Sequence, residues 1–347
     1  MKVLYNLYPS AFQNPGGGEI QMLQTKKFVE KQGLQVHFFD QWKTDLKDYG
    51  ILHTFGSVKY ALDIMEAAKS KGLKNVLSTI CWYDLRSAWH SPDFTASPYK
   101  STLRYLTKLV FPGFPSMRRR MFEISDLLLP NSRMEADQIG RLFAISPGKF
   151  FVVPNGVDLS FKDGDGGLFS RKYNIKDFVL YVGRIEPRKN IINMIKAFKN
   201  TDRPLVIIGD YVSMYAGYYN QCRKLAGGNV HFLGRMEHND PLLKSAYKAC
   251  DVFLMPSWFE TPGLSALEAA VSGAKIVITS GGCTKEYFKD FVLYVNPSKP
   301  VDICKAVTEA VNSGKTDSLQ NHIIKNFSWE KVAEITVNAY RQVNTES

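Results

Sequence analysis

The amino-acid sequence predicts an α/β protein of two domains, each built on a parallel sheet. Short apolar runs recur along the chain, many end at a glycine, and helix-like stretches separate them. Apolar runs without polar alternation are typical of strands buried on both faces, as parallel strands are. At 347 residues the chain is long enough for two such cores.

The second half shows the pattern most regularly. We expect strands at residues 178–182, 205–208, 229–234, 252–255 and 275–279, with helical spacing at 191–199. In an open parallel sheet, ligands bind where the carboxyl ends of the strands meet the following loops. The functional residues are therefore expected in those loops.

The first half repeats the alternation less regularly, with strands expected at 2–7, 35–39, 50–54, 75–79, 127–130 and 150–153. Residues 162–167, Lys-Asp-Gly-Asp-Gly-Gly, indicate a flexible linker. The sequence thus predicts Rossmann-like domains at residues 1–160 and 161–328. A final helix, 329–347, is expected to pack back on the first domain.

Composition narrows the class of protein. Hydrophobic residues make up 45% and charged residues 22%, a globular balance. No apolar stretch approaches the ~20 residues of a membrane span, and residues 1–8 resemble a first strand rather than a signal peptide. Five dispersed cysteines without a C-x-x-C pair indicate a reducing compartment. We expect a cytoplasmic protein.

The formal net charge of +11 is shared between the two halves. A basic surface attracts nucleic acid, anionic lipid or a phosphorylated small molecule. Aromatic residues are not interleaved with cations as in a nucleic-acid module, so no nucleic-acid partner is expected. The segment between Asp93 and Glu123 contains no acidic residue. Its six basic residues are Lys100, Arg104, Lys108, Arg118, Arg119 and Arg120.

The strongest motif follows the strand at 252–255. A turn leads into Gly263, Leu264 and Ser265, which would begin a helix and offer backbone N–H groups to a phosphate. Glu260 and Glu268 bracket this helix start and could hold sugar and ribose hydroxyls. The alternative, equally compatible with these residues alone, makes Glu260 a capping acid and Glu268 a solvated one.

A second motif, Gly183-Arg184-Ile185-Glu186-Pro187-Arg188-Lys189, follows the strand at 178–182. Its cations could neutralise a diphosphate, by bidentate contact from arginine or as a point charge from lysine. The alternative is a charged helix start on the surface. A third motif, Asn14-Pro15-Gly16-Gly17-Gly18-Glu19, allows close backbone approach to a ligand but lacks the spacing of a dinucleotide fingerprint.

Together these motifs resemble glycosyltransferase family 4, the retaining enzymes of GT-B architecture. Glu260 and Glu268, separated by seven residues, are similar to its E-x7-E motif, and Arg184 with Lys189 to its phosphate-binding pair. The resemblance implies that Glu268 binds the ribose and Glu260 the donor sugar, while Arg184 and Lys189 hold the diphosphate. Gly17, Gly18, Leu264 and Ser265 would add backbone donors. The rest of the expected donor-binding set is Gly183, Gly234, Arg235, Met236 and Gly263.

The resemblance further implies two parallel sheets facing across a cleft that closes on the donor. A nucleotide-sugar would be the donor substrate, sugar would pass with retention to a hydroxyl, and neither metal nor cofactor would be needed. Asp163-Gly164-Asp165 looks like a metal-binding D-x-D but indicates a turn. The expected acceptor is a saccharide or lipid-linked saccharide in cell-surface polysaccharide synthesis. The alternatives are an inactive nucleotide-binding subunit and a sugar-nucleotide epimerase.

The N-terminal half departs from the family. Cys81 or Trp82 stands where many members have a histidine after the strand at 75–79, and Pro262 replaces a frequent aromatic residue. His53 could lie in the cleft or pack in a loop. The catalytic residue of the first domain is therefore left open.

Residues 99–122, from Tyr99 to Phe122, combine the basic run with aromatic and aliphatic side chains. Such a segment suits the surface of an anionic bilayer and a peripheral place on the inner face of the membrane. The alternative is an amphipathic helix that covers the first core with its cationic face in water.

Overall fold

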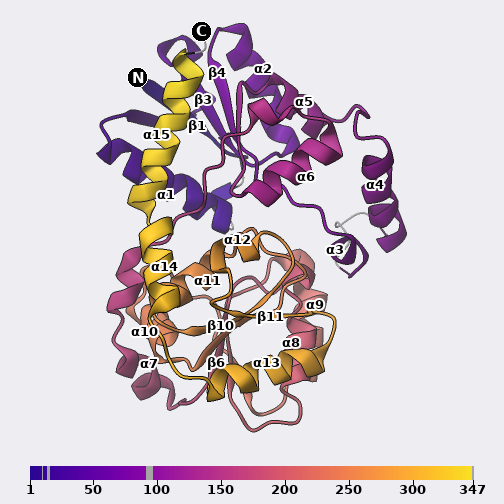
Figure 1. Ribbon diagram of the computed structural model, residues 1–347, viewed down its shortest axis with the longest axis vertical. Coiled ribbons are helices and arrows are strands. Elements are labelled where there is room, and N and C mark those ends of the chain that lie inside the picture. The colour runs from indigo at the N-terminus through magenta and orange to yellow at the C-terminus, as the bar shows by residue number, and fades with distance from the viewer. Residues whose placement is uncertain (10, 14–15, 91–96, 346–347) are drawn as a thin grey trace. The chain divides into compact units, whose positions relative to one another are not determined.

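The computed structural model describes residues 1–9, 11–13, 16–90 and 97–345. The chain divides into two compact units (Figure 1). The N-terminal unit comprises Met1–Tyr83, Thr102–Gly156 and Trp329–Ser347, and the C-terminal unit comprises Asp84–Ser101 and Val157–Ser328. The chain thus changes unit at 156/157, a few residues before the boundary placed at 160/161 from the sequence.

The N-terminal unit is built on a five-stranded parallel sheet of order β2-β1-β3-β4-β5. Its strands are β1 (Lys2–Asn6), β2 (Gln35–Phe38), β3 (Ile51–Phe55), β4 (Lys74–Ser78) and β5 (Leu127–Leu129). Alternate residues serve two cores: Val3 and Tyr5 pack on one face, and Leu4 on the other. Burial on both faces explains the continuous apolar runs.

Helices cover both faces of this sheet. They are α1 (Gly17–Lys31), α2 (Leu62–Ser70), α4 (Pro98–Val110), α5 (Met117–Ile124), α6 (Arg133–Phe143) and α15 (Trp329–Thr345), with α4 passing from one unit into the other. The 3-10 turns of this unit are η1 (Ala11–Gln13), η2 (Leu46–Asp48), η3 (Lys59–Ala61) and η4 (Pro147–Lys149).

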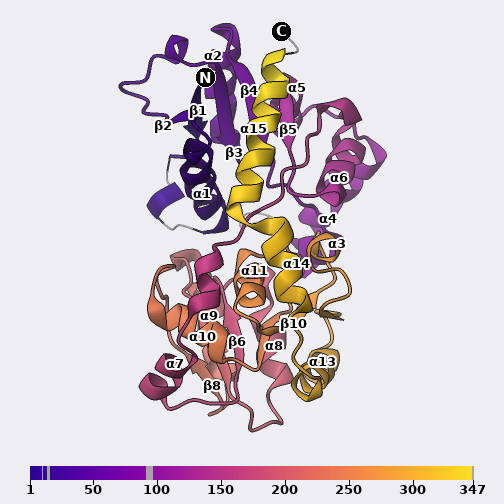
Figure 2. The same cartoon turned by 60° about the vertical axis from the view of Figure 1, so that its left-hand side comes forward.

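The last helix completes the N-terminal core. α15 runs alongside α1 (Figure 2), and its Tyr340 is fully buried. Tyr340 Oη lies 2.8 Å from Tyr5 Oη and 2.6 Å from His53 Nδ1, while His53 Nε2 lies 2.9 Å from Ser78 Oγ. His53 is therefore a core residue of β3 whose ring nitrogens both have partners. Burial lowers the pKa of His53 to about 3.

This buried histidine predicts a pH dependence of stability. The unfolded chain takes up a proton near pH 6.5 and the folded chain only near pH 3, so His53 destabilises the fold as pH falls between these values. The expected slope is about 1.4 kcal/mol per pH unit. His53→Gln should be less stable at neutral pH, and its deficit should shrink on acidification. Urea unfolding of both proteins at about pH 7.5 and about pH 4.5 checks this; a constant deficit would contradict it.

The C-terminal unit has a six-stranded parallel sheet of order β11-β10-β9-β6-β7-β8. Its strands are β6 (Val179–Val182), β7 (Leu205–Ile208), β8 (Val230–Phe232), β9 (Val252–Met255), β10 (Lys275–Thr279) and β11 (Leu293–Val295). From β6 the chain adds strands to one side, and from β9 to the other. The neighbours β6 and β9 therefore flank the topological switch point, where ligands bind in such sheets.

The helices of the C-terminal unit enclose two cores, with Val179 and Tyr181 facing one and Leu180 the other. They are α3 (Leu85–His90), α7 (Gly166–Tyr173), α8 (Ile191–Ala197), α9 (Ala216–Leu225), α10 (Pro241–Ala249), α11 (Leu264–Val271), α12 (Thr284–Phe288), α13 (Pro300–Asn312) and α14 (Ser318–Phe327). The 3-10 turns are η5 (Leu159–Asp163), η6 (Pro187–Lys189) and η7 (Ser213–Tyr215).

The predicted class, α/β with parallel sheets, is confirmed, and several details differ. The strand predicted at 150–153 is wrong: the segment donates two backbone bonds, to Leu128 and Pro130, but forms only an isolated bridge beside the three-residue β5. Pro154 follows and has no N–H to extend a ladder. The expected linker 162–167 is folded, because η5 ends at Asp163 and Asp165 caps α7. The short strand β11 was not predicted.

Candidate functional site

Two loops meet at the switch point of the C-terminal sheet. One follows β6 and contains Gly183, Arg184 and η6, and the other follows β9 and runs from Trp258 to Gly263. They are tied by a backbone bond in which Trp258 N donates to Arg188 O at 3.0 Å. The first two sequence motifs are thus brought together by the order of the strands.

The centre of this junction is an ion pair. Lys189 Nζ lies 2.7 Å from Glu260 Oε1, and Arg188 Nη1 lies 3.8 Å from the same oxygen. Only 3% of Glu260 is exposed. Its backbone N donates to Gly281 O, and Cys283 N donates to its carbonyl, so the loop after β10 also fixes it.

The cations determine the charge of this carboxyl group. Burial alone would raise the pKa of Glu260, but Lys189 and Arg188 outweigh it and hold the pKa below its usual range. Burial and the neighbouring Arg188 lower the pKa of Lys189. Glu260 is thus an ionised carboxylate beside two positively charged groups, an arrangement that can hold hydroxyl donors and an anion side by side.

Glu268 occupies a different environment on α11. Its Oε2 accepts a hydrogen bond from Tyr247 Oη at 2.7 Å, and its Oε1 lies 3.4 Å from His238 Nδ1. Burial raises the pKa of Glu268, against the opposing effects of His238 and Tyr247. Glu268 is buried rather than solvated, which rules out the surface interpretation of this residue.

The N-terminus of α11 lies between the two carboxylates in sequence. Gly263 is its N-cap, with φ of 93°. The first helical bonds are donated by Ala266 and Leu267 to Gly263 O, so the amides of Leu264 and Ser265 precede them. Amides in these positions are donors for an anion, and the helix dipole adds to the attraction.

A glycine follows each of the strands β6, β7 and β8, and the turns that contain Gly183, Gly209 and Gly234 pack against one another. Gly183 N donates to Ile208 O, and Gly209 N donates to Gly234 O at 2.8 Å. A Cβ atom on Gly209, at φ of 149°, would stand 1.9 Å from Gly183 O. The two turns can therefore pack only with glycine at position 209.

The remaining predicted residues of this unit flank these turns. Arg184 is half-buried, and its carbonyl accepts a bond from Tyr181 Oη at 2.9 Å. Arg235 is exposed and pairs with Glu237 at 3.3 Å, while Met236 packs on the core. Asp165, half of the apparent D-x-D, instead caps α7 and pairs with Arg171.

The other predicted residues belong to the N-terminal unit. Gly17 and Gly18 are the first two residues of α1, and Glu19 Oε2 accepts a bond from the backbone N of the N-cap Gly16 at 2.7 Å. Asn14 and Pro15 of that motif lie outside the described residues. Cys81 is buried with its backbone N bonded to Glu135, and burial raises the pKa of its thiol. A buried thiol with a raised pKa is a poor substitute for a catalytic histidine.

Comparison with known proteins fits this geometry. Residues 169–327, which include Glu260, Glu268 and the cations, match the family described as "Glycosyl transferases group 1". The matched segment contains all six strands of the C-terminal sheet.

Two relatives extend the similarity. An uncharacterized glycosyltransferase of Methanocaldococcus jannaschii is 28% identical over 240 residues, covering 60% of this chain and 58% of its own length. The matched segment therefore spans less than two thirds of that relative. A D-inositol 3-phosphate glycosyltransferase of Actinosynnema mirum is 28% identical over 312 residues, covering 80% of this chain and 74% of its own.

Solved structures agree with the fold. The sucrose-phosphate synthase of Thermosynechococcus elongatus superposes with a TM-score of 0.81 at 17% identity, covering 100% of this chain and 99% of its own. Anabaena HepE, solved with UDP and glucose, gives 0.71 at 16% identity over 99% and 100%. The chain has the GT-B fold of these neighbours.

Two residues of the C-terminal unit were missed as site residues, and a third, Arg188, was included among the cations of the second motif but given no role of its own. Arg188 contacts Glu260. Tyr247 and His238 hold Glu268 from α10 and the loop before it. No spacing in the sequence relates these two residues to Glu268, since the contacts arise from packing.

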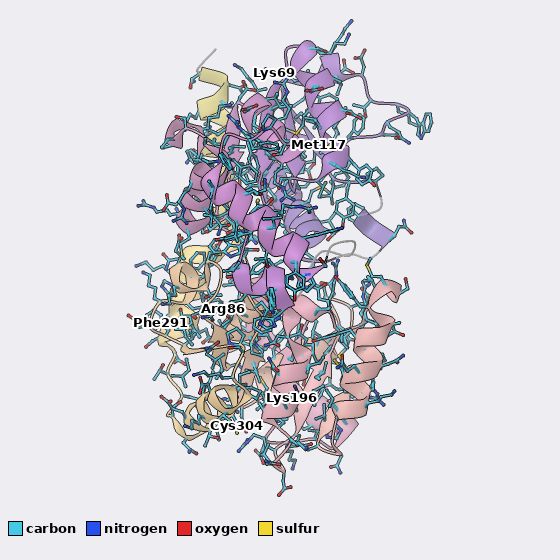
Figure 3. All side chains as sticks on the ribbon, turned by 90° about the vertical axis from the view of Figure 1, so that its right-hand side faces the viewer. Lys69, Arg86, Met117, Lys196, Phe291 and Cys304 are labelled. Carbon is cyan, nitrogen blue, oxygen red and sulfur yellow. The ribbon has the colours of Figure 1, made fainter. Side chains whose placement is uncertain are left out.

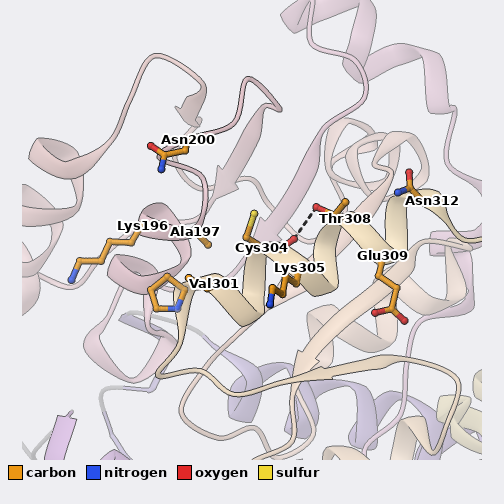
Figure 4. A pocket seen from close by; sticks show the side chains of 10 residues that line it. Lys196, Ala197, Asn200, Val301, Cys304, Lys305, Thr308, Glu309 and Asn312 are labelled. Carbon is orange, nitrogen blue, oxygen red and sulfur yellow. Dashed lines mark hydrogen bonds between the residues drawn. The ribbon is translucent and has the colours of Figure 1, made fainter.

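The C-terminal unit also has a groove of about 520 Å³ between α8 and α13. Figure 3 labels Lys196 and Cys304 in this region, and Figure 4 shows both among the lining side chains. The described residues that line it include none of the predicted site residues. The groove and the ion-pair junction are therefore separate features.

Proposed function

We propose that the chain is a retaining glycosyltransferase that moves a hexosyl group from a nucleoside-diphosphate donor to a hydroxyl acceptor. The observation that carries the proposal is the junction of Lys189, Arg188 and Glu260 at the switch point, next in sequence to the start of α11. The transferase-domain match over residues 169–327 supports it.

In the proposed reaction, the bond between the sugar and the diphosphate breaks and its electron pair leaves with the diphosphate. Lys189, with Arg184 as the second predicted cation, stabilises this charge, and the α11 amides add fixed dipoles. Glu260 orients the sugar by accepting hydrogen bonds from its hydroxyl groups. The two neighbouring cations, Lys189 and Arg188, hold Glu260 itself in place. The acceptor hydroxyl attacks the same face of the sugar and passes its proton to an oxygen of the departing diphosphate. The proposal assigns no metal or cofactor, since fixed cations can carry the leaving-group charge.

Glu268 is proposed to bind the ribose of the donor. A buried carboxylate already held by Tyr247 and His238 is fixed in place and can accept hydroxyl hydrogen bonds without further ordering. The UDP bound by the structurally similar HepE is consistent with a uridine donor. The neighbouring Gly234, Arg235 and Met236 would contact the base.

A thermal-shift screen against UDP, GDP, ADP and their sugar conjugates tests the donor site. A ligand at 100 times its dissociation constant should stabilise the protein by about 2.7 kcal/mol. The shift should appear with one nucleotide series. An absence of shift with every nucleotide would overturn the donor assignment. A shift without sugar transfer would instead favour the inactive nucleotide-binding subunit.

Glu268→Gln isolates the ribose contact. The amide keeps the size of the side chain but loses the charge, so we expect binding of the nucleotide to weaken by about tenfold to a hundredfold, as for a hydrogen bond to a charged group. The control is Glu309→Gln, on the exposed side of α13. Titration calorimetry measures both. Equal affinities in the two variants would show that Glu268 does not touch the nucleotide.

The acceptor is proposed to be a saccharide or lipid-linked saccharide of cell-surface polysaccharide synthesis. The relatives support only an acceptor hydroxyl in general, because the Actinosynnema mirum enzyme is named for D-inositol 3-phosphate and not for a polysaccharide. An epimerase would convert a nucleotide-sugar without any acceptor. Product analysis with the identified donor, with and without added saccharide, separates the two reactions.

A further inference from the structure

Helix α4 exposes its apolar stripe instead of burying it. Tyr99, Leu103, Leu106 and Val110 follow the i, i+4, i+7, i+11 spacing of one helical face. Their exposed fractions are 73%, 62%, 43% and 67%. The inward residue Tyr105 packs on the N-terminal core instead. An amphipathic helix with its apolar side outward indicates an interaction surface.

The turn after α4 continues this surface. Phe111 is 63% exposed and Phe114 73%. The turn is well defined: Phe111 N donates to Thr107 O at 2.8 Å, and Phe114 N donates to Phe111 O at 3.0 Å. Pro112 and Pro115 restrict its backbone further. Both rings are therefore presented by fixed backbone, which reduces the entropy lost when they bind.

The cations of the region divide into two groups. Arg119 pairs with Glu123 at 3.0 Å and Arg120 with Glu66 at 3.1 Å. Arg118 Nε donates to Ser57 O, and Lys108 Nζ lies 4.3 Å from the Phe143 ring centroid, so both face the N-terminal unit. Lys100 and Arg104 are the exposed cations of α4. Arg118, Arg119 and Arg120 are therefore less available to an anionic surface than the sequence suggested.

We infer that α4 and its following turn form a membrane-docking face, defined by Leu103, Leu106, Val110, Phe111 and Phe114. The apolar side chains would enter the interface of an anionic bilayer while Lys100 and Arg104 contact lipid headgroups. Charge complementarity favours an anionic bilayer: Lys100 and Arg104 are exposed on α4, residues 94–122 contain no acidic residue, and the same segment presents exposed aromatic rings typical of membrane interfaces.

This face would act by lying on the bilayer surface. Among the described residues, no helix is both long enough and apolar enough to cross a bilayer. Docking does not depend on the proposed sugar transfer. Membrane docking would further imply that the acceptor is lipid-linked, and only this implication rests on the proposed function.

The test is cosedimentation of the full chain with phosphatidylcholine vesicles, with and without phosphatidylserine. Phe111→Ser with Phe114→Ser should weaken binding by about tenfold or more, since each ring loses a large apolar contact. The matched control is Trp42→Ser with Tyr60→Ser, which removes two rings that are 85% and 65% exposed elsewhere on the unit. Lys100→Gln with Arg104→Gln should abolish most of the preference for phosphatidylserine.

Equal vesicle binding by the Phe111/Phe114 variant and the Trp42/Tyr60 control would overturn the inference, as would a wild-type chain that binds neither vesicle. Gel filtration without lipid tests whether a second copy of this chain occupies the face instead of a bilayer. A wild-type dimer that dissociates in the Phe111/Phe114 variant would assign the face to that second copy. The nucleotide thermal shift should be the same in every variant, so a failed donor site and a failed docking face are distinguished.

Discussion

Replacing Lys189 by alanine is expected to lower kcat by about a hundredfold to a thousandfold, the usual cost of removing one preorganised group that stabilises developing charge. Lys189 provides the positive charge closest to Glu260, at 2.7 Å. Steady-state kinetics with the donor identified by thermal shift measures the change. Lys196→Ala is the control, because Lys196 is exposed near the end of the following helix α8.

The same substitution also has a structural cost that must be separated from the catalytic one. Removing one partner of a buried pair costs about 3–5 kcal/mol. Arg188, 3.8 Å from Glu260, should limit the loss here. Adding Glu260→Gln to Lys189→Ala removes the unpaired charge and should restore much of the stability without restoring transfer. Recovery of transfer in that double variant, or unchanged kinetics in Lys189→Ala alone, would refute the assigned role.

Gly209→Ala should destabilise the C-terminal unit by more than about 4 kcal/mol, a loss that is exceptional for one methyl group. The added Cβ would stand 1.9 Å from Gly183 O, and φ of 149° is strained for any residue with a side chain. Relief requires the turns after β6 and β7 to separate, which would also displace Arg184. Denaturant unfolding and nucleotide binding should therefore both change.

Gly217→Ala provides the control for this experiment. Gly217 lies on α9, and a Cβ atom there would have no heavy atom within 4 Å. Alanine in a helix is favoured over glycine by about 0.5–1 kcal/mol, so this variant should be slightly more stable than the wild type. If Gly209→Ala and Gly217→Ala unfold at the same denaturant concentration, the close approach of the two turns is not needed for stability.

The parallel sheets were predictable because strands buried on both faces leave continuous apolar runs. The junction of Lys189 with Glu260 was partly predictable, since each motif directly follows a strand that the topology makes a neighbour of the other. The exact bounds of the strands were less predictable. The short strands β5 and β11 have only three residues each, too few for a periodic signal.

Other features depend on packing that no local pattern records. His53 gave no signal that it would bond Tyr340, which lies on a helix near the other end of the chain. The contacts of His238 and Tyr247 with Glu268 arise in the same way. In the basic segment, the sequence revealed charge and aromatic content, but only the structure showed that four cations have partners within the N-terminal unit while the apolar stripe of α4 faces outward.

The return of α15 to the N-terminal unit has a consequence for synthesis of the chain. Val332, Val337 and Tyr340 belong to the same core as Val3 and Tyr5. As the ribosome makes the chain, the core of the N-terminal unit stays incomplete until α15 has emerged, after the whole C-terminal sheet. The C-terminal sheet can close earlier, because its strands end at Val295. A premature stop just before α15 should therefore damage the distant beginning of the chain more than the strands next to the stop.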